Sequence, residues 1–308
     1  MAYHASPLLL LLGSCIGITS GFYGIGGGWL STPILNILGL SMPYAIGTSL
    51  VYIVSNSILG TFMHNKLKNI NYVLGFTIGF PSIFGVFIGK TFISYIGKSA
   101  NADIILRYIY IFFLILMSSY ILFESKFKLV PKSTKKKALP PLLHIKIDDN
   151  STLKISFWEL FFIGILVGFI SSIMGIGGGF LLLPILIYIM KIPVKLAVGT
   201  SLLRTLITGI SGGTLYILDK KVDYLSVIYL ILGTIIGVIL GASATKHVDS
   251  KKLKFLFGLT ILSASIAIVF KQLQFDTISK YFILSVSLFS AFIIIYMAYI
   301  KKKKHISN

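Results

Sequence analysis

The sequence predicts an all-α protein that crosses a membrane many times. Hydrophobic residues make up 56% of the 308 positions and charged residues only 12%, and the mean hydropathy is +0.91. Apolar stretches recur at about the 20 residues that an α-helix needs to cross ~30 Å of hydrocarbon. A soluble protein would have roughly a quarter of its residues charged and would show amphipathic periods. No basic residue precedes Leu8, so we expect the first apolar segment to be retained and not removed as a signal peptide.

A glycine cluster interrupts one apolar segment in each half of the chain. GIGGG occupies residues 24–28 and residues 175–179, and a proline follows five residues later in both places, Pro33 and Pro184. Glycine permits positive φ, and proline cannot continue the hydrogen bonding of a helix. We therefore expect a break in the membrane helix at each cluster.

The residues around the clusters repeat as well, so a whole unit is duplicated. GFYGIGGGWLSTPIL aligns with SIMGIGGGFLLLPIL at an offset of 151, and AIGTSL aligns with AVGTSL at an offset of 152. The chain then divides into a first membrane repeat at 8–123, a lysine-rich linker at 124–156, a second membrane repeat at 157–270 and an extra transmembrane helix at 281–299.

The apolar segments give the expected helices in order. In the first repeat they are 8–23, a short arm at 29–40, 44–63, 72–89 and 105–123. In the second repeat they are 157–174, a short arm at 180–190, 196–217, 225–245 and 255–270.

The positions of lysine and arginine indicate how the broken segments cross the membrane. If each glycine-broken segment is one straight crossing, the loops on the two sides carry 14 and 13 of these residues, and no orientation emerges. If each is a hairpin that returns to its own side, the same loops carry 20 and 7. The positive-inside rule then places the N-terminus outside, and the linker and C-terminus in the cytoplasm. The net charge of +19 thus reflects topology, and we expect no nucleic-acid partner.

A hairpin plus three spans ends on the side opposite to where it began, so the second repeat must enter the membrane from the other side. The predicted architecture is an inverted repeat, in which a glycine-tipped broken-helix hairpin and three transmembrane helices occur twice, with one C-terminal helix added. Many secondary transporters are built this way and hold substrate and coupling ions between broken helices near the midplane. Arms of about 16 and 12 residues reach only ~24 and ~18 Å, which favours re-entrant hairpins over two complete short crossings, although both have the same parity.

The glycine clusters are candidate binding elements. Unwound backbone inside a membrane is tolerated where it lines a cavity or packs in protein, and the helix that restarts after it offers free N–H groups and a positive dipole end, which suit an anion. The alternative is that the glycines only allow helices to pack tightly. The residues predicted to bind substrate here are Gly26, Gly27, Gly28, Gly177, Gly178 and Gly179.

The duplicated GTSL motif supplies hydroxyl groups near the start of the next helix. Its candidate ligands for an oxyanion or a sodium ion are Thr48, Ser49, Thr200 and Ser201. The alternative is that these hydroxyls bond carbonyl groups of their own helix. Asn56, which aligns with Thr208, is polar within a span and is a candidate to bridge helices.

Arg204 is a charged residue about nine positions into an apolar helix, at the place where the first repeat has Tyr52. A charge inside the membrane costs ~2.5 kcal/mol or more, so such a residue is a candidate site residue. No aspartate or glutamate lies in the middle of a span to neutralise it, and an anionic substrate would supply the missing partner. The alternative is an arginine that snorkels, which we expect of Lys90 and Arg107, near the ends of spans.

The paired GIGGG clusters, each with its proline and each followed by A-(I/V)-GTSL, resemble the sulfite exporter TauE/SafE family over about 230 of the 308 residues. The resemblance implies an inner-membrane or plasma-membrane carrier whose characterised members are linked to sulfite, thiosulfate, sulfoacetate and other sulfur-containing or organic anions. It also implies that the binding site lines up with the duplicated glycines, threonines and serines named above.

The chain departs from the family in two ways. It has no cysteine beyond Cys15, which argues against a thiosulfate route through thiol relays. Its linker is long, and Lys135 to Lys137 beside Pro140-Pro141 indicate a solvated cytoplasmic loop held by anionic lipid.

The sequence therefore predicts a secondary transporter that moves a small anion, and the resemblance implies a sulfur oxyanion or an organosulfonate. No nucleotide-binding motif is present, so an ion gradient would drive it, with Na+ and H+ both open as the coupling ion. A channel with the same hairpins is the main alternative, and a membrane scaffold or an enzyme acting on lipid is a third. No span carries a catalytic or metal-ligand set, so we expect no enzymatic activity, no metal and no cofactor. Whether the protein forms a homo-oligomer stays open.

Overall fold

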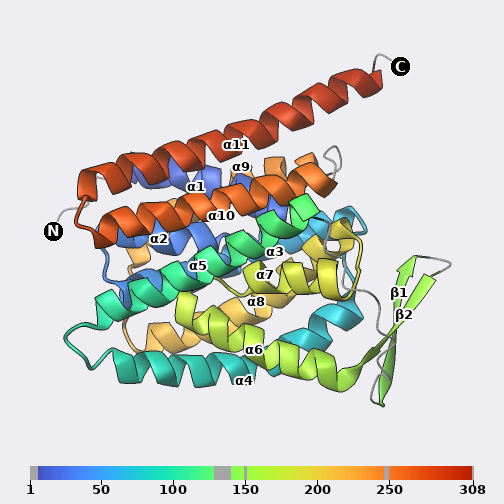
Figure 1. Cartoon of the computed structure of the whole chain (residues 1–308), viewed down its shortest axis with the longest axis horizontal. Coiled ribbons are helices and arrows are strands. Elements are labelled where there is room, and N and C mark those ends of the chain that lie inside the picture. The colour runs from blue at the N-terminus through green and yellow to red at the C-terminus, as the bar shows by residue number, and fades with distance from the viewer. Residues whose placement is uncertain (1–5, 128–139, 149–150, 246–249, 307–308) are drawn as a thin grey trace.

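The computed structural model describes residues 6–127, 140–148, 151–245 and 250–306 as a bundle of helices with one small β-hairpin at its end (Figure 1). The first half contains α1 (Ser6–Tyr23), α2 (Gly28–Ile37), α3 (Met42–Lys66), α4 (Tyr72–Ile96) and α5 (Ala102–Phe127). The second half contains α6 (Phe157–Met174), α7 (Gly179–Pro184), the π-helix η1 (Ile185–Ile189), α8 (Val194–Leu218), α9 (Tyr224–Ala244), α10 (Ser250–Gln272) and α11 (Asp276–Ile306).

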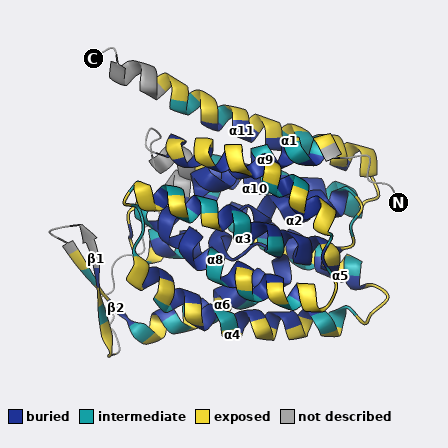
Figure 2. Cartoon of the chain, turned by 180° about the vertical axis from the view of Figure 1, so that it is seen from behind, coloured by how far each residue is buried: buried dark blue, intermediate teal, exposed yellow. Residues whose placement is uncertain are grey.

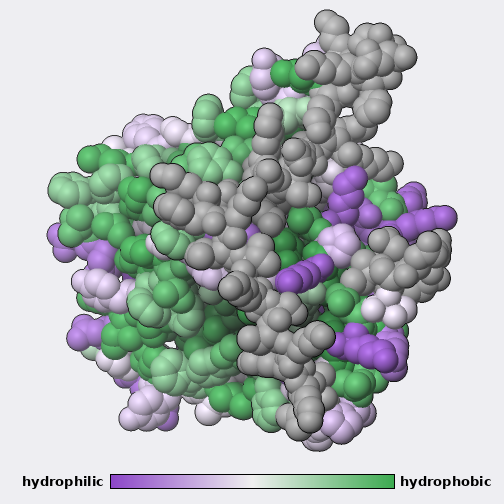
Figure 3. All heavy atoms as spheres, turned by 45° about the vertical axis from the view of Figure 1, so that its right-hand side comes forward, coloured by the Kyte–Doolittle hydropathy of each residue, from purple (hydrophilic) through white to green (hydrophobic). Residues whose placement is uncertain are grey.

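Eight helices of the described chain are long and apolar enough to cross a membrane, which confirms an all-α polytopic membrane protein. Large apolar side chains such as Phe80, Phe84 and Phe292 stay exposed on the outer faces of the bundle, where lipid would cover them. Figure 2 shows buried residues on the inward faces of the helices and exposed ones on the outside. Figure 3 shows hydrophobic residues over much of the left part of the view, and hydrophilic residues at its left margin and across its right-hand part.

The linker contains an element that the sequence analysis did not predict. Strands β1 (Leu142–Asp148) and β2 (Ser151–Ser156) pair antiparallel, with Leu143 opposite Ile155 and Ile145 opposite Leu153. Alternate apolar residues place one face of this hairpin inward, because side chains of a strand point to opposite faces in turn. The lysine-rich composition had suggested a solvated loop, and the predicted role of Lys135 to Lys137 lies outside the described residues.

Each half of the chain packs against the other through matched helix pairs. α1 lies along α9 and α6 lies along α4, while α3 packs on α8 and α5 on α10. Glycines set the close pairs: a Cβ added at Gly13 would lie 2.6 Å from the carbonyl oxygen of Leu230, and one added at Gly237 would lie 2.2 Å from that of Ser14. Small residues let membrane helices approach through their backbones, so α1 and α9 are held at close range.

The first GIGGG segment makes the chain turn back. α1 runs parallel to α9, since Gly13 meets Leu230 and Gly21 meets Val238. The start of α9 lies beside the start of α3, because the carbonyl oxygen of Lys221 approaches Gly47. α1 and α3 therefore begin at the same end of the bundle, so α1 and α2 form a hairpin and not one straight crossing.

The second GIGGG segment also turns back, from the other end. α6 runs parallel to α4, since Gly164 meets Ile78 and Gly168 meets Ser82. The loop before α4 touches the start of α8, where Gly199 meets the carbonyl oxygen of Asn69. The start of α1 lies at one end of the bundle, and the β-hairpin and the end of α11 lie at the other (Figures 1 and 2).

Two cations near helix ends are paired and do not snorkel, which corrects the prediction made for them. Lys90 is 6% exposed and bonds the carboxylate of Asp219, so it ties α4 to the end of α8. Arg107 pairs with Asp103 on its own helix and donates from Nε to Asn36 Oδ1 at 2.9 Å. Asp219 is 129 residues away from Lys90, so the sequence alone did not reveal that pairing.

Candidate functional site

The two glycine clusters adopt the same backbone conformation. The first, third and fourth residues of each cluster, all glycines, have positive φ: Gly24 +75°, Gly26 +86° and Gly27 +86° in one half, and Gly175 +70°, Gly177 +73° and Gly178 +78° in the other. Side chains are disfavoured in this region, so these positions favour glycine. The last glycine of each cluster, Gly28 or Gly179, starts the returning helix.

The two turns lie directly against each other. A Cβ added at Gly28 would stand 2.3 Å from the carbonyl oxygen of Gly175, and one added at Gly179 would stand 2.8 Å from Cα of Ile25. Thr32 of α2 also donates to the carbonyl oxygen of Gly175 at 3.3 Å. The contact is backbone on backbone, which explains the need for glycine at the fifth position as well.

The turns meet at the middle of the bundle. Gly26 and Gly177 both lie against Ile53 of α3 and Thr205 of α8. Each of these two side chains is close to the centre of a 25-residue helix. A membrane that follows the length of these helices would have the glycine turns near its midplane.

The first two residues of GTSL hold the loops between helices. Gly47 and Gly199 leave room for a loop backbone, as described above, and the hydroxyls of Thr48 and Thr200 accept hydrogen bonds from the backbone N–H groups of Asp223 and Asn71, both at 2.9 Å. Asp223 and Asn71 precede α9 and α4 at matching places. The structure thus places both threonine hydroxyls at loop anchors.

The serines of GTSL face the glycine hairpins. Ser31 of α2 donates to Ser49 at 2.9 Å. The second repeat has Leu182 where the first has Ser31, and the Ser201 hydroxyl is buried with no hydrogen-bond partner among the described residues. It lies 2.9 Å from the Cβ position of Gly179. Ser201 is therefore an available hydroxyl beside a glycine turn.

These placements predict that substitutions of the two threonines and of Ser201 affect different quantities: stability for the threonines and KM for Ser201. Thr48→Val and Thr200→Val should each lower the free energy of unfolding by ~1 kcal/mol, because a partly buried N–H loses its acceptor, and should leave the KM for transport unchanged. Ser201→Ala should raise the KM and leave thermal stability unchanged. Thermal unfolding in detergent and flux in proteoliposomes measure the two quantities. An unchanged KM for Ser201→Ala would remove Ser201 from the site.

Arg204 is fully buried beside the second glycine turn. Its Nη1 donates to the carbonyl oxygen of Gly177 at 2.7 Å, and the Thr208 hydroxyl donates to the same oxygen at 2.8 Å. Nε and Nη2 have no hydrogen-bond partner within the described chain, and no acidic side chain there forms an ion pair with Arg204. The bond to the carbonyl uses only Nη1, so a positive charge whose Nε and Nη2 nitrogens have no partner in the described chain stays inside the bundle.

Further polar atoms without described partners surround the first turn. They are Asn56 Oδ1, Ser57 Oγ and Thr205 Oγ1, all buried. Asn56 also donates to Ser20 at 2.6 Å, so it bridges α3 and α1 as the sequence suggested. Ser57 and Thr205 were not singled out from sequence; polar residues next to Asn56 and Arg204 in apolar helices were the signal. Among the residues described, no cluster of His, Cys, Asp and Glu could hold a metal ion.

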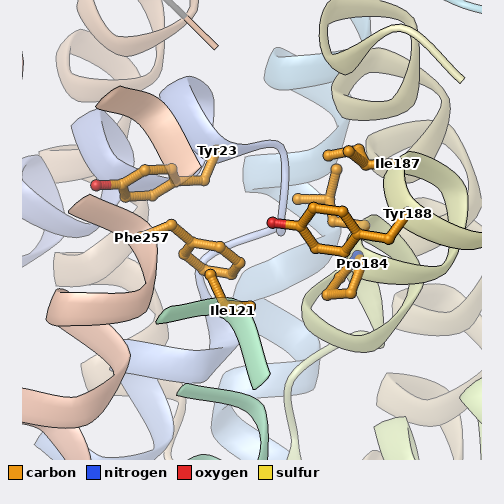
Figure 4. Close-up of a pocket in the computed structure, with 7 residues that line it drawn as sticks. Tyr23, Ile121, Pro184, Ile187, Tyr188 and Phe257 are labelled. Carbon is orange, nitrogen blue, oxygen red and sulfur yellow. The ribbon is translucent and has the colours of Figure 1, made fainter. Parts of the chain in front are cut away.

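An aromatic cluster covers the restarting helices on one side. Phe257 of α10 lies 6.1 Å from Trp29 and 6.4 Å from Phe180, measured between ring centroids, and Trp29 and Phe180 are the matching residues directly after the two clusters. A small apolar hollow adjoins it, lined by Tyr23, Ile121, Leu183, Pro184, Ile187, Tyr188 and Phe257. Figure 4 shows the Tyr188 hydroxyl pointing toward Phe257, whereas the Tyr23 hydroxyl points away.

A helical membrane bundle with free polar atoms at the meeting point of two broken helices has the architecture of a membrane transporter. The family described as sulfite exporter TauE/SafE matches residues 9–268, so the chain belongs to this family of membrane transporters. Proteins of this class are not enzymes in general.

The similar proteins are described as probable membrane transporters. The chain is 33% identical to a probable membrane transporter protein, MJ0441, of Methanocaldococcus jannaschii, over 71% of this chain and 75% of the relative. It is 24% identical to the probable membrane transporter protein YunE of Bacillus subtilis, over 86% and 97%, and 27% identical to YjnA of the same organism, over 86% and 100%. No solved structure matches the chain.

Proposed function

We propose that this protein is a secondary transporter that moves a small oxyanion of sulfur, such as sulfite or an organosulfonate, by alternating access. Arg204 is the observation that carries the proposal. A buried guanidinium that has no acidic partner in the described chain is costly in a membrane, and a bound anion would offset that cost. The family description supports a sulfur oxyanion in particular.

The free edge of Arg204 favours an anion with two oxygens on one centre. Nη1 is committed to the Gly177 carbonyl, so Nε and Nη2 remain as two parallel donors. This is the edge with which arginine binds a carboxylate, sulfonate or phosphate through two hydrogen bonds. A halide is a single atom without oxygens, so it would not engage both donors of this edge as two separate oxygens do. Ser201 and Thr205, on the same helix, would complete the cradle.

The arrangement of the two halves supports alternating access. α1 and α6 begin at opposite ends of the bundle, and each half reaches the centre by a glycine turn, as an inverted repeat would. In such transporters the repeats rock about a site at their interface. We infer that opening one hairpin exposes Arg204 to one side of the membrane, and opening the other exposes it to the opposite side.

We propose that the protein lies in the plasma membrane or bacterial inner membrane, with the linker and C-terminus in the cytoplasm. Single cysteines placed in a Cys15→Ser background test this orientation. A cysteine at Ser151 in the β-hairpin should react with an impermeant maleimide only after the cells are opened, whereas one at Asn101, between α4 and α5, should react in intact cells. Labelling of position 151 from outside would reverse the proposed orientation.

Uptake into proteoliposomes tests the transport activity itself. Purified protein should take up labelled sulfite or a short-chain sulfonate with saturable kinetics, and unlabelled anion trapped inside should accelerate entry of the label. That exchange requires a carrier that binds on one side and releases on the other. Non-saturable flux without acceleration would indicate the channel, and no flux of any oxyanion above protein-free liposomes would contradict the proposal.

A further inference from the structure

The first arm of each hairpin is a helix, α1 or α6. The last carbonyl groups of any helix have no hydrogen-bond partner within that helix. In the second half, the Tyr216 hydroxyl donates to the carbonyl oxygen of Ser172 at 3.1 Å. In the first half, Nε2 of His64 lies 3.1 Å from the carbonyl oxygen of Gly21. Ser172 and Gly21 are both the third residue from the end of their helices, α6 and α1.

His64 and Tyr216 are matching residues, since they are 152 positions apart, the same offset that aligns the GTSL motifs. The two halves thus form a hydrogen bond to the same carbonyl position of the first arm. The donor is a histidine in the first half and a tyrosine in the second. Tyrosine ordinarily ionises near pH 10 and histidine near pH 6.5, so only the first hairpin is held by a side chain that changes charge near neutral pH.

The state of the His64 ring follows from its contact. A carbonyl oxygen only accepts, so Nε2 carries the hydrogen and Nδ1 carries the lone pair. His64 is fully buried, and Nδ1 has no hydrogen-bond partner among the described residues. A proton on Nδ1 would become a buried donor that needs an acceptor or water, whereas the end of the α1 dipole favours the positive charge.

We propose that His64 binds the coupling proton and that protonation of Nδ1 favours the state in which the α1–α2 hairpin lets water reach this end of the bundle. The inference rests on the proposed transport function. Proton binding is linked to hairpin position because the bond to Gly21 lies on the arm that must move, three residues before the turn begins at Gly24. Conversely, closure of the hairpin over a dry Nδ1 expels the proton.

The elements packed around this bond carry few competing groups. α1, which bears Gly21, and α9, which lies along it, contain no charged residue. Their titratable side chains, with the other titratable or charged ones of α3, α8, α5 and α6, are Cys15, Tyr23, Tyr224, Tyr229, Tyr44, Tyr52, Lys66, Lys195, Arg204, Tyr216, Asp103, Arg107, Tyr108, Tyr110, Tyr120, Glu124, Lys126 and Glu159. α11 also packs on α1 and α9, and over the part of it whose side chains are described it adds Asp276, Lys280, Tyr281, Tyr296 and Tyr299. None of these groups ordinarily titrates between pH 6 and 7, whereas the imidazole of His64 does.

The chain supplies its own control, because Tyr216 shows which side chain can make the bond without a proton site. His64→Tyr should keep a donor toward Gly21 and remove the titration. His64→Gln is a second variant that also keeps a donor, in case tyrosine does not fit. Tyr216→Phe removes the matching bond of the other half and no proton site, so it reports on the loss of a hairpin contact alone.

The measurement is oxyanion accumulation and anion exchange in proteoliposomes that hold the full-length protein. A pH step of one unit should drive wild-type accumulation up to ~10-fold, the ratio that one proton per anion supports. In His64→Tyr or His64→Gln, accumulation should fall to about 1-fold, while exchange of labelled for unlabelled anion without a pH step continues. Tyr216→Phe should still accumulate anion in response to the step.

The outcomes separate this inference from the transport proposal. If both His64 variants exchange anion and still accumulate it with the pH step as the wild type does, His64 is not the proton site. If the wild type exchanges anion but ignores the pH step, with or without a sodium gradient, proton coupling is wrong and the transport proposal stands. If the wild type exchanges no anion, the transport proposal itself fails.

Discussion

Arg204→Leu will abolish saturable oxyanion flux and leave a folded protein. The free guanidinium edge supplies two charge-assisted hydrogen bonds to the anion, each worth ~1.5–3 kcal/mol. Their loss should lower the apparent affinity at least ~100-fold. Arg204→Lys keeps the charge and loses the paired donors, so it should bind more weakly than the wild type and discriminate less between oxyanions and chloride. Initial rates over a range of anion concentrations measure both effects.

Stability should move in the opposite direction in the leucine variant. An unpaired buried charge destabilises a fold, and an apolar side chain in its place removes that penalty. Thermal unfolding of Arg204→Leu in detergent should therefore occur at or above the wild-type temperature. Arg107→Leu is the matched control, because it removes an arginine with an acidic partner outside the site. It should lower the unfolding temperature and leave the KM unchanged. Equal flux of Arg204→Leu and wild type would remove Arg204 from the mechanism.

Gly28→Ala will disrupt the meeting point of the two turns. The added methyl group would stand 2.3 Å from the backbone oxygen of Gly175, so one hairpin has to shift. Forced overpacking of this kind costs ~1–3 kcal/mol, and a backbone neighbour cannot swing aside as a side chain can. We expect a lower unfolding temperature and flux below ~10% of wild type, since the shift moves the turn that carries the Gly177 carbonyl away from Arg204.

Gly213→Ala is the control for this substitution. Gly213 lies in α8, and a Cβ there would be 3.4 Å from the nearest atom, which is ordinary contact. Alanine also has the higher helix propensity, so stability should be unchanged or slightly raised. If Gly28→Ala and Gly213→Ala behave alike in unfolding and in flux, the close approach of the turns is not needed for stability or transport.

Much of the architecture was predictable because the sequence motifs that produce it occur twice in the chain. The duplicated GIGGG clusters predicted the helix breaks, and the distribution of lysines predicted that the chain turns back at each of them. In the structure α1 runs parallel to α9 and α6 runs parallel to α4, an arrangement consistent with that prediction. Both signals are local or additive along the chain. They need no knowledge of which helix faces which.

Other features depended on contacts that no local pattern reveals. The GTSL motif predicted four equivalent hydroxyls, but Thr48 and Thr200 meet loop N–H groups, whereas Ser201 meets a glycine turn. That difference depends on which face of the helix meets a distant loop. The pairing of Lys90 with Asp219, 129 residues away, was hidden for the same reason. Arg204 was found because a charge in an apolar helix is conspicuous without any partner.

Equilibrium binding of a sulfur oxyanion to the purified protein tests the central claim most directly, since it asks only whether Arg204 and the glycine turns form an anion site. Labelled sulfite or a short-chain sulfonate should bind wild-type protein saturably at one site per chain, and unlabelled oxyanion should displace it far better than chloride. Arg204→Leu should show no saturable binding, while Arg107→Leu should bind as the wild type does. Equal binding to the wild type and to Arg204→Leu would contradict the account.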